Sequence, residues 1–516
     1  MKIYDVVIVG AGVIGCAIAR ILAQTNLSLL IIEKEPDTGF GISSRNSGVV
    51  HSGIHYTPGS NRAVYNVQGN RMMEGLCREL KVPFKRSGKI TVAFNENQVD
   101  TLSALLKQGI ENGVPGIKLI DKKEMDVLQP GTRGKAALYT PSTGIISPYE
   151  LTIALAESAY ANGADFKFNH TVESIDIPMP DSAQQREHFV LQTKYAENSG
   201  TKPISYAAKI LINAAGLGST DIAKMAGIDD YTIYPCRGEY YVLDKRLRDS
   251  LNLLIYPVPG AHSSGLGIHL TNTVDGNILI GPSNEYIIDD EDTSTTIDIM
   301  KTLREEGHHL LPALGGSDFI RSFSGIRPKL APPKEGGFRD FIIESRQDVP
   351  GFINLTGIES PGLTASPAIA EQVKSLVGEL LPLRARDNIV RGRPVIHNIP
   401  FTEQKFSTCS REEKSELITR NRDYGSIVCR CEEVTAAEIK EAAARTLGPV
   451  TFAGIKYRTR AMMGRCQGGF CLQRLTEILR ESFGIATDEQ TLKGPGTELF
   501  TGLLRTLQEP GTKESL

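Results

Sequence analysis

A glycine-rich motif near the N-terminus restricts the fold of this chain more than any other feature. Gly10, Gly12 and Gly15 form G-x-G-x-x-G directly after an apolar, β-branched run at residues 5–9. A helical pattern and a second apolar run follow, and that run ends in Glu33, 18 positions after the third glycine. This order of elements is typical of a dinucleotide-binding βαβ unit. The sequence therefore predicts an α/β fold with a nucleotide site at its first turn.

Each part of this motif has a mechanical role. The first glycine permits a tight turn, the second lets the backbone approach a pyrophosphate, and the third lets helix and strand pack closely. The pyrophosphate would lie at the positive end of the helix, and Glu33 would accept hydrogen bonds from a ribose hydroxyl. We expect the adjoining Val13, Ile14 and Lys34 to bind the nucleotide as well.

The rest of the first 380 residues alternates between two patterns. A capping box beginning at Ser147 predicts a helix to about residue 162, and residues 209–213 read as an apolar strand. Short strands with turn signals occupy residues 236–285, which indicates an inserted antiparallel sheet. A strand at 353–355 and a helix at 368–377 return to the first pattern. The predicted fold is a Rossmann-like domain that contains an antiparallel substrate domain.

Four cysteines crowd the C-terminal region, beyond a Pro- and Arg-rich stretch at residues 382–410 and a short helix predicted from Ser410. Their pattern is C-x-C followed by C-x4-C, formed by Cys429, Cys431, Cys466 and Cys471. Two close pairs of thiolates can hold either zinc or a [2Fe–2S] cluster, and free thiols are the third alternative.

Charge and hydropathy exclude other classes of protein. The chain has 516 residues with 57 Lys and Arg against 60 Asp and Glu, and this balance argues against a nucleic-acid binder. The apolar run at residues 6–19 is only 14 residues long, too short to span a bilayer, and lacks a signal-peptide pattern. We expect a cytoplasmic protein whose association with a membrane, if any, is made through a partner.

Five segments carry a resemblance to a known family. The N-terminal 380 residues are similar to the D-amino-acid-oxidase-type flavoenzymes, which include glycerol-3-phosphate dehydrogenases and L-2-hydroxyglutarate oxidases. The matching segments are GISSRNSGVVHSGIHY at 41–56, INAAGLGS at 212–219, CRGEYY at 236–241, SGIRPK at 324–329 and GIESPGLTASPAIAE at 357–371. The resemblance implies FAD, bound in an extended form across the domain.

The resemblance also implies which residues contact FAD. Ser44, Asn46 and Ser47 would line the pyrophosphate and flavin, and Val172 would touch the adenine. The remaining implied contacts are Ala215, Gly216, Gly357, Gly362, Leu363 and Thr364. Glycines and a helix N-terminus beside the flavin can stabilise the anionic reduced ring.

Four residues are candidates for the substrate side. The resemblance places His51 close to the reactive edge of the flavin, where a histidine suits the task of general base. It places Arg327 where relatives hold an anionic group, which a guanidinium binds in bidentate fashion. Tyr256 and His269 lie in the inserted sheet that should roof the substrate. A buried Tyr or His with satisfied hydrogen bonds is the structural alternative for both.

Two motifs favour different substrates. Glycerol-3-phosphate dehydrogenases usually carry arginine where this chain has His55, and the HSGIHY segment looks closer to the L-2-hydroxyglutarate enzymes. The C-terminal region instead resembles that of anaerobic glycerol-3-phosphate dehydrogenase large subunits. Its residues 427–474 resemble the bacterioferritin-associated-ferredoxin-like domain, which carries [2Fe–2S].

We therefore expect an FAD-dependent dehydrogenase of a small anionic hydroxy substrate. Electrons would leave through the cluster to an acceptor protein or a quinone-linked subunit. An amino- or imino-acid dehydrogenase and a non-catalytic electron-relay subunit are the alternatives. The expected boundaries are an oxidoreductase region at 1–381, a linker at 382–424, a [2Fe–2S] domain at 425–482 and a tail at 483–516. Within the oxidoreductase region, the FAD-binding parts are expected at about 1–90, 145–225 and 325–381. The substrate parts are expected at about 91–144 and 226–324.

Overall fold

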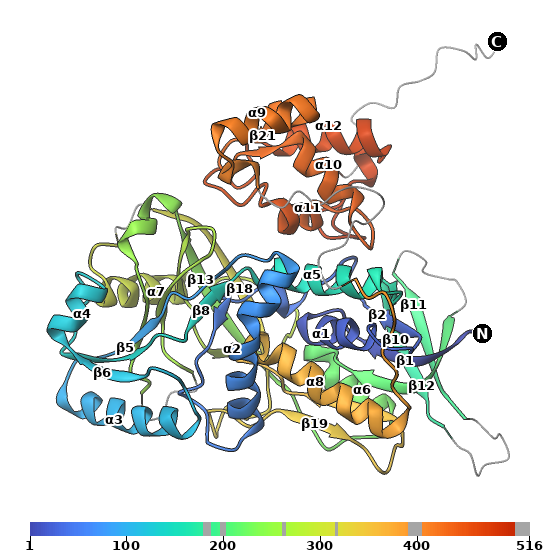
Figure 1. Ribbon diagram of the computed structural model, residues 1–516, viewed down its shortest axis with the longest axis horizontal. Coiled ribbons are helices and arrows are strands. Elements are labelled where there is room, and N and C mark those ends of the chain that lie inside the picture. Colours follow the sequence, from blue (N-terminus) through green and yellow to red (C-terminus); the bar gives the residue numbers. More distant parts are fainter. Residues whose placement is uncertain (179–186, 197–202, 261–264, 315–317, 391–404, 501–516) are drawn as a thin grey trace, which may run out of the picture. The chain divides into compact units, whose positions relative to one another are not determined.

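The chain divides into two units, Met1–Glu403 and Gln404–Leu516. The computed structural model describes residues 1–178, 187–196, 203–260, 265–314, 318–390 and 405–500 (Figure 1). Within these ranges, none of the helices combines the length and the apolar character that crossing a bilayer requires.

The first unit contains a mixed sheet that begins with the N-terminal strand. Strand β1 pairs in parallel with β2 and β12, while β9 extends β2 and β20 extends β12, also in parallel. Strands β10, β11 and β19 join antiparallel. The bounds are β1 (Ile3–Val9), β2 (Leu29–Ile32), β9 (Asp165–Lys167), β10 (His170–Asp176), β11 (Phe189–Tyr195), β12 (Ile204–Asn213), β19 (Ile342–Ser345) and β20 (Phe352–Thr356).

Beside this sheet, α1 (Val13–Leu22) packs against both α5 (Pro148–Ala161) and α8 (Gly362–Leu380) (Figure 1). The short α6 (Ser219–Met225) contacts β10 and β20. Strand β1 is an apolar run with Val6 and Ile8 completely buried, as a parallel strand covered on both faces should be. The predicted βαβ unit is confirmed.

A second sheet is the predicted insertion. Its neighbouring strands are antiparallel except for β14 and β5, which run parallel. The strands are β5 (Lys89–Ala93), β6 (Lys118–Asp121), β7 (Ala136–Thr140), β13 (Tyr234–Leu243), β14 (Leu254–Pro257), β15 (His269–Asn272), β16 (Ile278–Gly281), β17 (Glu285–Tyr286) and β18 (Phe319–Lys329). Helices α3 (Glu96–Glu111), α4 (Lys122–Leu128) and α7 (Ile297–Leu310) pack on it.

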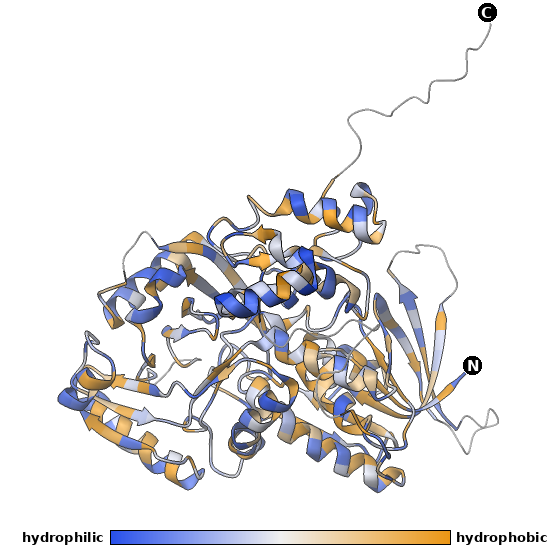
Figure 2. Ribbon diagram, turned by 45° about the horizontal axis from the view of Figure 1, so that its top comes forward, coloured by the Kyte–Doolittle hydropathy of each residue, from blue (hydrophilic) through white to orange (hydrophobic). Residues whose placement is uncertain are grey.

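The apolar side chains of this second sheet form a core of their own, with Ile90, Ile255, Leu270 and Leu303 among its buried members. The helices alternate hydrophobic and hydrophilic residues, as helices with one face on a core do (Figure 2).

Within the first unit, the chain also forms a small sheet and a long helix beside the two large sheets. Strands β3 (Val49–Val50), β4 (Phe84–Lys85) and β8 (Gly144–Ile146) pair antiparallel. Helix α2 (Asn61–Leu80) packs against α8. A Cβ at Gly69 would lie 2.0 Å from the Thr364 carbonyl oxygen, so only glycine permits this close crossing.

Helix α8 begins six residues before the predicted start at 368. A proline inside a helix lacks the N–H that would bond the carbonyl four positions earlier. In the structure the Ser366 hydroxyl donates to the Leu363 carbonyl at 3.0 Å, and Leu363 is the residue four positions before Pro367. This side chain replaces the missing backbone donor, so the helix continues through Pro367.

The second unit is a small helical unit with a two-stranded ladder. Its elements are α9 (Arg411–Arg420), β21 (Ile427–Cys429), β22 (Val434–Thr435), α10 (Ala436–Ala444), α11 (Phe452–Thr459) and α12 (Leu472–Phe483). Val428, Ile439, Phe452 and Leu475 are buried in its core. The short helix predicted from Ser410 is present as α9, with Ser410 and Glu413 forming a capping box.

The segment expected to be a linker contributes residues to both units. Ala385 forms a bridge with Thr25 of the first unit. Phe406 and Tyr424 pack with Ala437 of the second. Residues 391–404 lie outside the described residues.

Candidate functional site

The glycine motif lies at the turn from β1 into α1. Gly10 has φ +106°, and a Cβ there would lie 2.5 Å from the Ala214 carbonyl oxygen. A Cβ at Gly15 would lie 2.0 Å from the carbonyl oxygen of Gly10. A Cβ at Gly12 would meet only Ser43 Oγ, at 3.3 Å. Gly10 and Gly15 are therefore required by backbone packing, while Gly12 keeps the helix N-terminus accessible.

Glu33 follows β2 and faces the same turn. Its carboxylate accepts hydrogen bonds from the backbone N–H of Ala11 at 2.6 Å and of Glu35 at 2.9 Å. Burial raises the pKa of Glu33. Val13 is buried and its N–H donates to Ser43 Oγ at 2.9 Å, whereas Lys34 is exposed. Ile14 is half-buried on the first turn of α1.

The segment after Gly41 is held by its own side chains. Asn46 Nδ2 donates to the Ser43 carbonyl at 2.9 Å, and Asn46 Oδ1 accepts from the Gly48 N–H at 2.9 Å. Ser44 Oγ donates to the Gly41 carbonyl at 3.3 Å. Asn46 therefore shapes the loop, and the next residue, Ser47, lies close enough to Tyr240 to influence the pKa of its hydroxyl.

The remaining expected FAD contacts lie on β10, after β12 and around α8. Val172 is buried on β10, and the Ala215 N–H donates to Asn213 Oδ1 at 3.3 Å. Gly216 and Gly357 have φ +60° and +70°, in the left-handed region that favours glycine. Leu363 is half-buried on the first turn of α8, directly after Gly362.

Thr364 ties the start of α8 to the segment that carries His51. Its Oγ1 accepts the His51 N–H at 3.0 Å and donates to the Val49 carbonyl at 3.3 Å. Ser360 Oγ lies 3.3 Å from His51 Nε2. These contacts join residues more than 300 positions apart in the chain and fix the position of the His51 ring.

His51 and His269 are both held neutral. Burial lowers the pKa of His51 well below its usual value, and the nearby charge of Lys89 adds to the effect. Burial also lowers the pKa of His269 to about 3. His269 Nδ1 is 2.9 Å from the Gly267 carbonyl, which can only accept, so this nitrogen carries the proton. The Tyr256 ring stacks on His269 at 3.7 Å between centroids.

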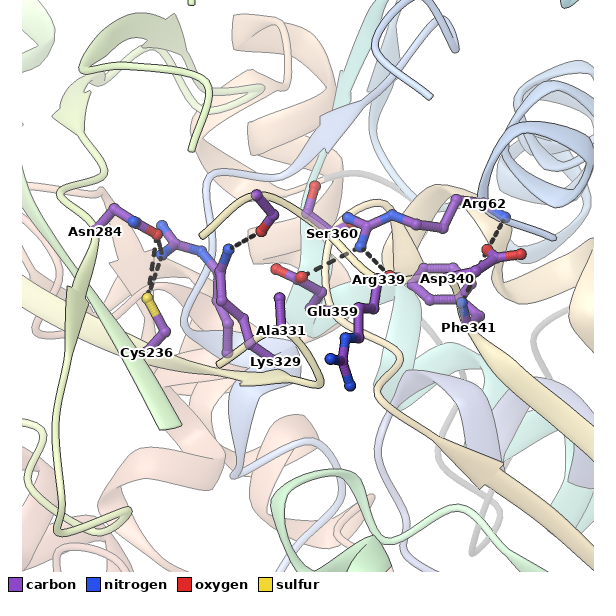
Figure 3. Close-up of polar contacts among 12 residues, drawn as sticks. Arg62, Cys236, Asn284, Lys329, Ala331, Arg339, Asp340, Phe341, Glu359 and Ser360 are labelled. Atoms are coloured by element: carbon purple, nitrogen blue, oxygen red, sulfur yellow. Dashed lines mark hydrogen bonds and ion pairs between the residues drawn. The ribbon is translucent and has the colours of Figure 1, made fainter. Parts of the chain in front are cut away.

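Arg327 on β18 is surrounded by neutral partners. Its guanidinium donates to the Ser283 carbonyl at 2.9 Å and to Asn284 Oδ1 at 3.1 Å, and Cys236 Sγ lies 3.7 Å away. Figure 3 shows Asn284 beside Cys236 at one end of this region. A Cβ at Gly238 would lie 2.5 Å from Arg327 Nη2, so the guanidinium uses the space that this glycine leaves.

Sequence reasoning missed three charged residues near these groups. Arg62 forms an ion pair with Glu359 at 3.2 Å, and both side chains are at most 4% exposed. Arg62 also donates to the carbonyls of Arg339 and Ser360 (Figure 3). Lys89 Nζ lies 3.3 Å from His55 Nε2. The only feature of the sequence that could have pointed to Lys89 is its place at the start of an apolar strand.

In the second unit the four cysteines lie in two interacting pairs. Cys429 interacts with Cys471, and Cys431 interacts with Cys466. The first pair is buried and the second exposed. The interaction with Cys471 lowers the pKa of Cys429, which favours its thiolate.

The neighbourhood of these pairs fits a two-iron cluster. A Cβ at Gly464 would lie 2.1 Å from Cys431 Cβ, so glycine is required beside this thiol. Two separate thiol pairs match the two irons of [2Fe–2S], each of which takes two cysteines.

Two family models match the two units of the chain. The family model described as FAD dependent oxidoreductase (DAO) matches residues 5–376. The model described as BFD-like [2Fe-2S] binding domain matches residues 427–481. FAD and [2Fe–2S], the cofactors expected from the sequence, are confirmed.

Two curated relatives and one solved structure illustrate the likeness. The chain is 38% identical over 502 residues to a glycerol 3-phosphate dehydrogenase of Caloramator mitchellensis, covering 97% of this chain and 98% of that one. It is 31% identical over 405 residues to the mitochondrial L-2-hydroxyglutarate dehydrogenase of Arabidopsis thaliana, covering 72% and 82%. The dithionite-reduced, FAD-bound L-alpha-glycerophosphate oxidase of Mycoplasma pneumoniae has a TM-score of 0.69 at 31% identity, over 77% of this chain and 100% of that one.

Proposed function

Because this chain belongs to the FAD-dependent oxidoreductase (DAO) family, we propose that it oxidises a hydroxyl-bearing carbon of a small anionic substrate. Glycerol 3-phosphate is the first candidate. The observation that carries it is the likeness to the glycerol 3-phosphate dehydrogenase of Caloramator mitchellensis, which extends over both units. L-2-Hydroxyglutarate is the second candidate, favoured by the Arabidopsis thaliana relative and by the HSGIHY segment.

FAD, when bound, accepts the hydride that leaves the alcohol carbon. The residues of this chain then have to remove the hydroxyl proton. His51 is neutral and so has a free ring nitrogen to accept that proton. Ser360 and Thr364 hold the ring and its backbone in place, which keeps the accepting nitrogen oriented.

His269 complements His51 as a hydrogen-bond acceptor. Since its Nδ1–H is used by the Gly267 carbonyl, its Nε2 is left unprotonated. The stacked Tyr256 ring fixes the plane of the imidazole. His269 can therefore orient the substrate hydroxyl toward His51.

Arg327 supplies the anion contact. Its hydrogen bonds to Ser283 and Asn284 fix the guanidinium without neutralising its charge. A carboxylate or phosphate that binds there gains a charge-assisted hydrogen bond. The same contact excludes neutral polyols, which carry no matching charge.

Electron exit through the second unit is part of the proposal. The [2Fe–2S] cluster held by Cys429, Cys431, Cys466 and Cys471 would take the electrons one at a time and deliver them to a separate acceptor protein or quinone-linked subunit. The exposed pair, Cys431 and Cys466, gives the cluster an edge on the surface of its unit.

A turnover assay with an artificial electron-acceptor dye tests the substrate class. The panel is glycerol 3-phosphate, L-2-hydroxyglutarate, glycerol, L-lactate, glycine and L-proline. We expect turnover with one of the first two and little with glycerol, which carries no negative charge. Turnover with glycine or L-proline alone would instead support an amino- or imino-acid dehydrogenase. No turnover with any of them, together with flavin reduction by a protein donor, would support a relay subunit.

A further inference from the structure

Lys89 is a buried lysine that the mechanism above does not use. It is the first residue of β5 and is 1% exposed. Among the residues that the structure describes, no carboxylate lies within ion-pair distance of its ammonium group. A buried cation without an acidic partner is strongly unfavourable unless the group loses its proton or a ligand supplies the opposite charge.

The Lys89 ammonium group lies among the candidate catalytic side chains. Its Nζ is 3.3 Å from His55 Nε2 and 4.6 Å from the centroid of the Tyr256 ring. Tyr256 in turn stacks on His269. The charge of Lys89 contributes to the lowered pKa values of His51, His55 and His269, so it acts on all three rings.

Lys89 and Arg327 act on the same histidine from different strands. Both charges lower the pKa of His269. Neither cation is paired with a carboxylate in the described residues, in contrast to Arg62 with Glu359 and Arg237 with Glu285 and Asp292. A ligand beside His269 therefore meets two positive charges with which no carboxylate of the described residues forms an ion pair.

We propose that Lys89 is a substrate-binding residue that, together with Arg327, selects a substrate carrying two negative charges. This inference deepens the proposed function and rests on it for the identity of the substrate. Both candidate substrates are dianions. A phosphate monoester carries both negative charges on one group, and a dicarboxylate carries one at each end.

The environment of Lys89 predicts how binding depends on pH. Burial lowers the pKa of Lys89 to about 7. The groups that face it are His51, His55, His269 and Tyr256; the histidine pKa values are lowered and that of Tyr256 is raised well above its usual value. Lys89 is thus the member of this group that loses its charge as the pH rises through about 7. Affinity for a dianion should fall as the pH rises through that value.

The test is the holoenzyme of the Lys89→Met variant, with Lys107→Met as the matched control. Methionine keeps the length and removes the charge from a buried site, so the variant should fold at least as well as the parent. Lys107 is an exposed residue of α3. Lys89→Gln serves as a second variant, and thermal unfolding shows whether both variants are folded.

Two probes of binding are independent of turnover. Inorganic phosphate and glutarate are titrated into each holoenzyme, and binding is read from the perturbation of the flavin absorbance. We expect one of them to bind the wild type, and Lys89→Met to weaken it about 10- to 100-fold. Lys107→Met should leave it unchanged. Phosphate binding points to the phosphate monoester, and glutarate binding to the dicarboxylate.

The outcomes separate the inference from the proposed function. If wild type binds a probe and Lys89→Met weakens that binding, but neither hydroxy substrate reduces the flavin, the proposed function fails while the role of Lys89 stands. If Lys89→Met binds the probe as tightly as wild type, or if neither probe binds wild type, the role of Lys89 is overturned. A shifted flavin midpoint potential with unchanged affinity would assign Lys89 to the flavin instead and also overturn it.

Discussion

Replacing Gly238 by alanine tests the role of Arg327 without touching its charge. Gly238 lies in β13 opposite Gly325 of β18, two positions from Arg327. It does not have a left-handed φ, so alanine is compatible with its backbone. The effect of the substitution must therefore come from the space that the new methyl group occupies.

The magnitude follows from the geometry. The added Cβ would lie 2.5 Å from Arg327 Nη2 and 3.1 Å from its Cζ, against ordinary contacts of 3.4–4 Å. It would also lie 2.9 Å from Pro282 Cβ, which limits retreat of the backbone. A guanidinium displaced by about 1 Å to restore a normal contact cannot keep the 2.9 Å bond to Ser283 and the 3.1 Å bond to Asn284.

Loss of a hydrogen bond from a charged donor weakens an interaction by about 1.5–3 kcal/mol. We therefore expect Gly238→Ala to raise KM for the preferred anionic substrate by about 10- to 100-fold, with a smaller change in kcat. Steady-state kinetics with an artificial acceptor measure both constants. Flavin content is measured on the same preparations to show that the cofactor site is intact.

The matched control is Gly75→Ala. Gly75 lies on the exposed side of α2, and a Cβ there would meet nothing within 4 Å. This variant should keep the wild-type KM and be slightly more stable, because alanine is the better helix former. A Gly238→Ala enzyme whose KM stays within about twofold of wild type would refute the assignment of Arg327 as the anion contact.

Four further predictions address other parts of the account. His51→Gln should lower the rate of flavin reduction by about 100-fold or more at unchanged flavin content, because the proton acceptor is lost; rapid anaerobic mixing measures it, and a wild-type rate would contradict it. Gly15→Ala should lower flavin content and melting temperature, since its Cβ would lie 2.0 Å from the Gly10 carbonyl oxygen. Lys89→Met should raise the free energy of unfolding by up to about 5 kcal/mol below pH 7, because burial lowers the lysine pKa from 10.5 to about 7. The unfolded wild-type chain binds the lysine proton more tightly than the folded one, so the stability advantage of the variant should shrink as pH rises from 7 to 10.5. Denaturant unfolding of both proteins at pH 6.5 and 10 checks this direction. Cys466→Ser should remove the iron–sulfur absorbance while substrate still bleaches the flavin, and retention of a normal cluster would show that Cys466 is not a ligand.

The N-terminal βαβ unit was predictable because its signals are local. The apolar strand, the glycine turn and the acidic residue lie within 33 positions, and each residue type is required there for one dominant physical reason. The inserted antiparallel sheet was also predictable from the turn signals between its short strands. Helix α8 shows the limit of such reasoning, since the Ser366 hydroxyl compensates for Pro367 and no general rule anticipates that contact.

The candidate site was less predictable because its contacts are distant in the chain. His51 meets Thr364 and Ser360 only after folding brings β3 and α8 together. Lys89 opens a strand in which every residue is buried, yet a lysine at that position usually marks an exposed strand end. Only the structure shows that its ammonium group faces His55 rather than water.

The most direct test of the central claim is anaerobic visible absorption of the holoenzyme after addition of glycerol 3-phosphate and, separately, L-2-hydroxyglutarate. We predict that one of them bleaches the flavin band, and that the broad iron–sulfur absorbance declines with it as electrons pass to the cluster. A flavin that stays oxidised with both substrates would contradict the proposed oxidation. Flavin bleaching with a cluster that stays oxidised would contradict the proposed route of electron exit.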